Sequence, residues 1–108
     1  MKSTIASRQL RALSALAQHR NYTRAALDLQ VTQSAVTHAI QTLEEDLGVR
    51  VVRLDRNRMA LTRVGSKILY HANRILREMH EIRAHADRVQ QKERRALRLR
   101  LLPARKAA

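Results

Sequence analysis

A spaced repeat of apolar residues in the second half of the chain most constrains what this sequence can fold into. Apolar side chains recur there at alternating intervals of four and three residues, over about three heptads. The repeat consists of Ile68, Ala72, Ile75, Met79, Ile82, Ala86 and Val89. This spacing predicts a long helix that begins after a Thr62 N-cap and reaches at least Gln91 with a narrow apolar seam. A chain of 108 residues cannot cover such a seam alone, so we expect a homodimer formed through these residues.

Apolar residues beside the seam qualify this prediction. Leu69 and Leu76 widen the seam near its beginning, which indicates that the first turns pack on the rest of the chain and the later turns on a partner. The competing interpretation is a helix that folds back across the first half of the chain.

Residues 92–108 are rich in Arg, Leu and Ala, and their pattern is compatible with a continued helix, an edge strand or a disordered basic tail.

The first half of the chain predicts three helices and a hairpin. Apolar spacing indicates helices over residues 4–19, 24–29 and 33–47, with Thr23 and Thr32 as N-caps and Gly48 as the stop of the third. Tyr22 and Leu27 have the spacing of a hydrophobic staple. Two β-prone segments, 50–54 and 59–61, flank a polar turn. We therefore expect a mainly α fold, with three helices and a small β-hairpin as one domain over residues 4–62, a long dimerisation helix over 63–91 and a basic tail over 92–108.

The second and third predicted helices are joined by only three residues, which is helix-turn-helix spacing. With the apolar stripe of the third helix turned inward, its N-terminal turns present short polar side chains to solvent, as a DNA recognition helix does. Gln41 is suited to pair bidentately with adenine. Arginines of the hairpin and of the second helix are placed to meet phosphates. The predicted DNA-binding residues are Thr23, Arg24, Thr32, Gln33, Ser34, Thr37, His38, Gln41, Arg53, Arg56 and Arg58.

The charge of the chain supports a polyanionic partner. It carries 22 Lys and Arg against 9 Asp and Glu, a net charge of +13. Both a sequence-specific DNA reader and a non-specific, nucleoid-type DNA-coating protein are consistent with this charge. A membrane-surface role is disfavoured because the long helix mixes both signs of charge and places alanines on its seam. No stretch approaches the length and apolarity of a membrane span.

Catalysis has little support in the sequence. The chain has no cysteine, and no glycine-rich phosphate loop is present. Its histidines, His19, His38, His71, His80 and His85, do not cluster with acids or at metal-ligand spacing. We therefore expect no enzyme activity, no cofactor and no metal. The first ten residues lack the apolar run of a signal peptide, so we expect a cytoplasmic protein.

The motifs YTRAA, LQVTQSAVTHAIQTLEEDLGV and ALTRVG occur in register over some sixty residues. Together they resemble the DNA-binding region of LysR-type bacterial transcriptional regulators, and the resemblance extends over about residues 8–91. It implies a winged helix-turn-helix that binds double-stranded DNA and regulates transcription. It also implies linker helices that pair antiparallel in a dimer.

The chain departs from the family pattern at several places. Ser34 stands where proline is common, and His38 stands where arginine is frequent. The family's LF-x-R is replaced by residues 51–54, so its wing arginine does not carry over to Leu54, and we expect Arg53 to take its place. RALRLRLLPARKAA stands where the family's effector domain would begin. We therefore expect no small-molecule effector on this chain, and mixed dimers with full-length relatives become an option.

Overall fold

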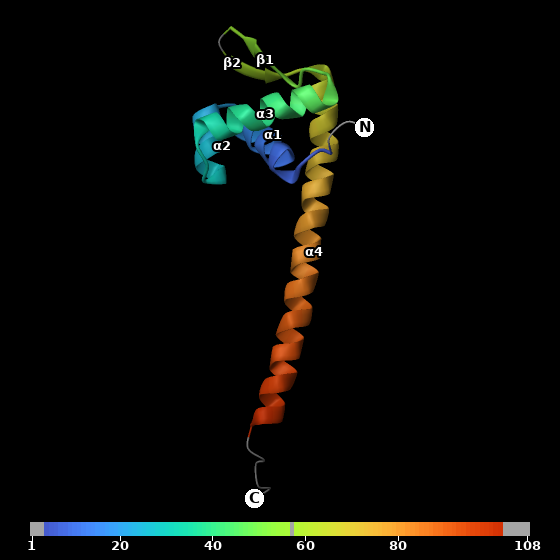
Figure 1. The fold of residues 1–108 in the computed structure, drawn as a ribbon. Helices are drawn as coiled ribbons and strands as arrows, with labels where there is room; N and C mark the ends of the chain where they lie inside the picture. Colours follow the sequence, from blue (N-terminus) through green and yellow to red (C-terminus); the bar gives the residue numbers. More distant parts are fainter. Residues whose placement is uncertain (1–3, 57, 103–108) are drawn as a thin grey trace, which may run out of the picture. The chain divides into compact units, whose positions relative to one another are not determined.

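The computed structural model describes residues 4–56 and 58–102. This part of the chain contains three short helices, two strands and one long final helix (Figure 1). The chain divides into two compact units, Met1–Leu76 and Arg77–Ala108. The first unit contains α1 (Ser7–His19), α2 (Tyr22–Leu29), α3 (Gln33–Leu47), the strands β1 (Val52–Asp55) and β2 (Arg58–Leu61), and the beginning of α4 (Arg63–Leu101). The second unit contains the rest of α4. The predicted fold class, a mainly helical winged helix-turn-helix with a long following helix, is confirmed.

The core of the first unit lies between the three short helices. Its largest fully buried side chains are Leu13, Leu16, Val36, Ile40, Leu43 and Val51. Several buried alanines, among them Ala12, Ala25 and Ala39, lie between these side chains. Small side chains at these positions let the helices approach closely, and the larger aliphatic side chains fill the remaining space.

The ends of the short helices differ in part from the prediction. Thr32 caps α3 as expected, accepting a hydrogen bond from the Ala35 amide, and Gly48 ends that helix in the left-handed conformation. The cap of α2 is Asn21 rather than Thr23, because the Asn21 side chain accepts from the Arg24 amide and α2 begins at Tyr22.

The predicted hydrophobic staple is wrong for the same reason. Tyr22 occupies the first turn of α2 and packs on the core, whereas Leu27 is 73% exposed. The first helix also begins at Ser7, three residues later than predicted, after an extended Ala6. A Gln9 side chain reaches back to accept from the Ala6 amide and so defines this beginning.

The predicted hairpin is present, with strands one or two residues shifted from the expected segments. β1 and β2 are antiparallel in the register Val52↔Leu61 to Asp55↔Arg58. Val51, Val52 and Met59 are buried and join the helical core, so the base of the hairpin is anchored while its far end is exposed. Asn57 of the predicted turn lies outside the described residues.

The long helix α4 begins as predicted at a Thr62 cap, whose hydroxyl accepts from the Gly65 amide. Its first turns pack on the core through Ile68 and Leu69. For this reason the first compact unit extends to Leu76, beyond the boundary at residue 62 expected from the sequence. The helix continues past Gln91 to Leu101, which selects the helical option for residues 92–101; residues 103–108 lie outside the described part. Within the described residues, no helix combines the length and apolarity needed to cross a membrane.

Candidate nucleic-acid interface

Helix α3 has one buried and one exposed face. Val36, Ala39, Ile40 and Leu43 are buried in the core. On the other side Ser34, His38 and Gln41 are exposed, and Thr37 is partly exposed. The exposed side chains are short or have planar amide and imidazole groups that donate and accept hydrogen bonds. This strip, Ser34 to Gln41, therefore has the chemistry to contact base edges.

Hydroxyl groups around the helix-turn-helix hold its geometry. Thr23 Oγ1, at the beginning of α2, donates to Gln33 Oε1 at 3.1 Å and so ties the two helix beginnings together. Thr37 Oγ1 donates to the Gln33 carbonyl, and Thr32 is occupied with its cap. These three hydroxyls, all predicted as DNA contacts, make hydrogen bonds within the chain that hold the beginnings of α2 and α3.

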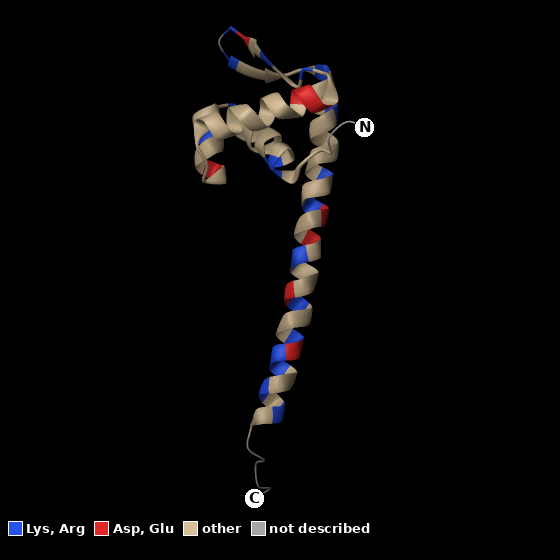
Figure 2. Ribbon diagram, viewed as in Figure 1, with Lys and Arg blue, Asp and Glu red and all other residues tan. Residues whose placement is uncertain are grey.

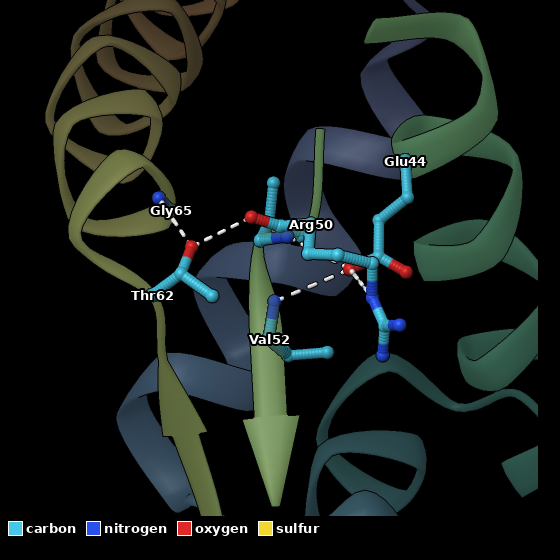
Figure 3. Close-up of polar contacts among 6 residues, drawn as sticks. Glu44, Arg50, Val52, Thr62 and Gly65 are labelled. Atoms are coloured by element: carbon cyan, nitrogen blue, oxygen red, sulfur yellow. Dashed lines mark hydrogen bonds and ion pairs between the residues drawn. The ribbon is translucent and has the colours of Figure 1, made fainter. Parts of the chain in front are cut away.

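A glutamate on α3 holds the beginning of the wing (Figure 3). Glu44 Oε2 accepts hydrogen bonds from the backbone amides of Val51, at 2.7 Å, and Val52, at 3.3 Å, and from Arg50 Nε at 3.3 Å. The Glu44 side chain is only 14% exposed. The sequence analysis assigned no role to Glu44. Its place beside the inward-facing Leu43 was the available signal.

A second contact joins the beginning of α4 to the beginning of the hairpin. The Thr62 hydroxyl donates to the Arg50 carbonyl at 2.6 Å while it caps α4 (Figure 3). Gly65, in the first turn of α4, lies so close to the Val51 carbonyl that a Cβ there would overlap it. Glu44 and Thr62 thus hold the segment 50–52 from both sides, which fixes where the wing leaves the core.

The wing carries three exposed arginines, Arg53, Arg56 and Arg58, as expected. Arg56 has a left-handed backbone, φ 53°, at the far end of the hairpin. Arg20, between α1 and α2, lines the same surface groove as Arg56 and Arg58. Figure 2 shows Lys and Arg at the far end of the hairpin and acids at the end of α3. Sequence reasoning missed Arg20, because its nearness to the wing exists only in the folded chain.

A second groove runs between α3 and the segment that leads into the wing. Thr37, Gln41 and Glu45 line one side, and residues 48–50 and 52 line the other, with Tyr22 also contributing. Burial raises the pKa of the Tyr22 phenol; the charge of Glu44 adds to this shift and that of Arg50 opposes it. The phenol therefore remains protonated near neutral pH and offers a hydrogen-bond donor beside Gln41.

The structure divides the apolar seam of α4 into two parts. Ala72 is 1% exposed and so is covered by its own chain, whereas Ile68 packs on the core but is only partly buried. The prediction that Ala72 lies at a dimer interface is therefore corrected, because no surface of this residue remains for a partner. Ile75, Met79, Ile82, Ala86 and Val89 remain exposed, and with the partly exposed Ile68 they stay the predicted interface.

Comparison with known proteins gives a family match from α1 to the first turn of α4. The family model for bacterial regulatory helix-turn-helix proteins of the lysR family matches residues 7–66. The RuBisCO operon transcriptional regulator of Allochromatium vinosum is 35% identical over 81 residues, which cover 72% of this chain and 27% of that protein. The HTH-type transcriptional regulator CysB of Thiocapsa roseopersicina is 42% identical over 94 residues, covering 85% of this chain and 69% of that sequence.

A solved structure extends the comparison to three dimensions. The DNA-binding domain of CbnR, crystallised in complex with DNA, superposes with a TM-score of 0.62 at 34% sequence identity, covering 85% of this chain and 98% of that one. The chain spans about a quarter of the length of three of the curated relatives it matches, covering 27%, 26% and 23% of them.

Proposed function

The chain belongs to the LysR family of bacterial regulatory helix-turn-helix proteins, and we propose on this premise that it binds double-stranded DNA sequence-specifically and regulates transcription. The observation that carries the proposal is the exposed strip of α3, Ser34 to Gln41, which lies on a helix whose opposite face is fixed in the core. A helix held in this way enters the major groove as a rigid unit.

Base recognition falls to the exposed side chains of α3. The Gln41 amide matches the N6 and N7 pattern of adenine, and the Ser34 hydroxyl reaches either a base edge or a phosphate. His38 replaces the arginine frequent in the family and presents a shorter side chain with a ring nitrogen. The phenol of Tyr22 lies in the groove beside Gln41 and adds a donor to this surface.

Phosphate contacts fall to the surrounding arginines. Arg24 lies in the first turn of α2, where backbone amides and the helix dipole favour an anion. Arg53, Arg56 and Arg58 extend the basic surface along the wing, and Arg20 adds to it near Arg56. Such contacts fix the orientation of the protein on the duplex without reading its sequence.

The exposed part of the seam, from Ile75 to Val89, supports a homodimer. Two copies of α4 would cover these side chains. The dimer would then place its two α3 helices on two DNA half-sites. Full-length relatives with a similar seam would form mixed dimers with this chain. Co-expression with such a relative tests that part of the proposal, and unchanged activity of the relative would contradict it.

The competing function is non-specific DNA coating, for which the net charge of +13 alone would suffice. The two functions differ in the spread of affinities. A sequence reader holds its site about 10³-fold or more above random DNA. A coating protein shows a steep dependence on salt and little preference among sequences. The ordered, exposed strip of α3 favours the reader.

Selection of binding sites from random duplexes with the purified chain tests the proposal. We expect enrichment of a two-fold symmetric motif. Gln41→Ala should cost about 1–3 kcal/mol and relax preference at one base position, whereas Arg56→Ala should weaken binding to all sequences and reduce the salt slope by about one unit. No enriched motif, together with equal effects of both substitutions on random DNA, would show that no sequence is read.

A further inference from the structure

The C-terminal turns of α4 carry a cluster of positive charge that has no part in the proposed DNA contacts of α3 and the wing. From Arg88 to Arg100 the helix holds six bases and one acid, Glu93. All of these side chains are exposed, and Figure 2 shows Lys and Arg dominating this part of α4. The ion pairs in the described part of the chain, His19–Asp28 and Arg50–Glu44, involve none of them. Like charges at helical spacing destabilise a helix, so the cluster lowers stability unless an anion binds it.

Three of these bases lie on one face. Arg88, Lys92 and Arg95 are spaced by four and three residues, which places them within about 60° around the helix and over about 10 Å of its length. They line one surface groove together with His85, Val89 and Gln91. We call Arg88, Lys92 and Arg95 the basic stripe.

The basic stripe and the apolar seam occupy different sides of α4. Ile82, Ala86 and Val89 lie on average about 120° around the helix from the basic stripe. Val89 belongs to the seam and also lines the edge of the groove of the basic stripe, so a partner helix on the seam would reach that edge but leave the three cations accessible. The two features can act at the same time, one in dimer formation and the other in binding an anion.

We propose that the basic stripe is a second DNA-binding surface, which contacts the sugar–phosphate backbone independently of base recognition by α3. Duplex DNA carries one negative charge per about 1.7 Å of its axis, so a stripe about 10 Å long faces several phosphates. The choice of DNA among polyanions rests on the proposed function. The stripe would add affinity and salt dependence without adding sequence preference.

An anionic membrane surface fits the same segment less well. A surface-bound helix needs its bulky apolar side chains gathered opposite the charges. Leu97, Leu99 and Leu101 are all exposed, but they follow one another at intervals of about 200° around the helix. Leu97 and Leu101 share a face roughly opposite the basic stripe, but Leu99 lies on the same side as the stripe, so the bulky apolar side chains are not gathered opposite the charges.

The test compares two triple variants of the full chain. The stripe variant is Arg88→Gln, Lys92→Gln and Arg95→Gln; the matched control is Arg83→Gln, Arg94→Gln and Arg100→Gln, which removes the same charge from other faces of the same helix. Gln preserves helix propensity, and circular dichroism and sedimentation check folding and dimer formation. Affinity for a long random-sequence duplex is measured over a range of salt concentrations.

The stripe variant should lose up to nearly three units of salt slope, about 0.9 for each phosphate contact removed, and the control should lose less than one. Equal losses in both variants, or none in either, would overturn the proposal. Loss of binding to phosphatidylserine vesicles with an unchanged DNA slope would overturn it in favour of a membrane. Site selection with the wild-type chain is scored separately, so failure of sequence reading by α3 is distinguishable from failure of the stripe.

Discussion

At the scale of single residues, Glu44 has a role that its chemical type does not reveal. An acid on the helix proposed to read DNA would ordinarily repel phosphates. Here its carboxylate is largely buried and accepts hydrogen bonds from the amides of Val51 and Val52. Charge-assisted bonds of this kind are shorter and stronger than neutral ones. Glu44 therefore links the position of α3 to that of the wing.

Glu44→Gln should weaken this link. The amide oxygen of glutamine still accepts, but without a full charge, so we expect a loss of about 1–2 kcal/mol in the free energy of unfolding. Hydrogen exchange at the Val51 and Val52 amides should accelerate before global unfolding. Glu45→Gln, at the exposed neighbouring position, is the control and should change neither quantity. Unchanged exchange in Glu44→Gln would show that the hydrogen bonds do not hold the wing.

At the scale of elements, both turns of the three-helix unit are made by residues other than glycine. Arg20 and Gln30 end α1 and α2 with left-handed backbones, φ 53° and 58°. This conformation costs roughly 1–2 kcal/mol for an L-residue with a Cβ. The backbone N–H of Gln30 donates to the carbonyls of Ala26 and Leu27. The turn between α2 and α3 is therefore tight, although it lacks glycine, the residue best suited to a left-handed backbone.

Gln30→Gly should therefore stabilise the chain. We expect a gain of about 0.5–1 kcal/mol in urea unfolding, since glycine relieves the left-handed strain but increases the entropy of the unfolded chain. The same substitution at Gln18, inside α1, should instead destabilise by about 0.5–1 kcal/mol. Destabilisation at both positions would indicate that the Gln30 side chain contributes contacts that outweigh the strain.

At the scale of the whole molecule, the exposed seam leaves the single chain incomplete. Ile75 is 48% exposed and Ile82 is 70% exposed, which is unfavourable for large aliphatic side chains repeated along one helix face. A second copy of α4 would bury them.

Ile75→Lys combined with Ile82→Lys should yield monomers in sedimentation experiments, because burying two lysines in an apolar seam is costly. The first unit should stay folded, since its core lies elsewhere. His80→Lys with Gln91→Lys adds the same side chains on another face of α4 and should leave the dimer intact. A persistent dimer in the first variant would show that the chains associate through a different surface.

The sequence by itself determined the parts of this protein that depend on local spacing. The period of Val36, Ala39, Ile40 and Leu43, the Thr32 cap and the Gly48 stop are properties of adjacent residues, so α3 was predicted with its observed bounds. The hairpin and the Thr62 start of α4 followed from similar local signals. The exposure of Ser34, His38 and Gln41 then follows, because the face of a helix opposite its apolar stripe is fixed once the stripe is known.

Only the tertiary structure decided which residues act across elements. Competing caps one or two residues apart, such as Asn21 and Thr23, differ by amounts that packing of Tyr22 on the core overrides. The contact of Glu44 with residues 50–52, the nearness of Arg20 to Arg56 and the burial of Ala72 depend on how separate elements meet. Spacing along the chain describes one element at a time, whereas burial and hydrogen bonding between elements are set by the free energy of the packed whole.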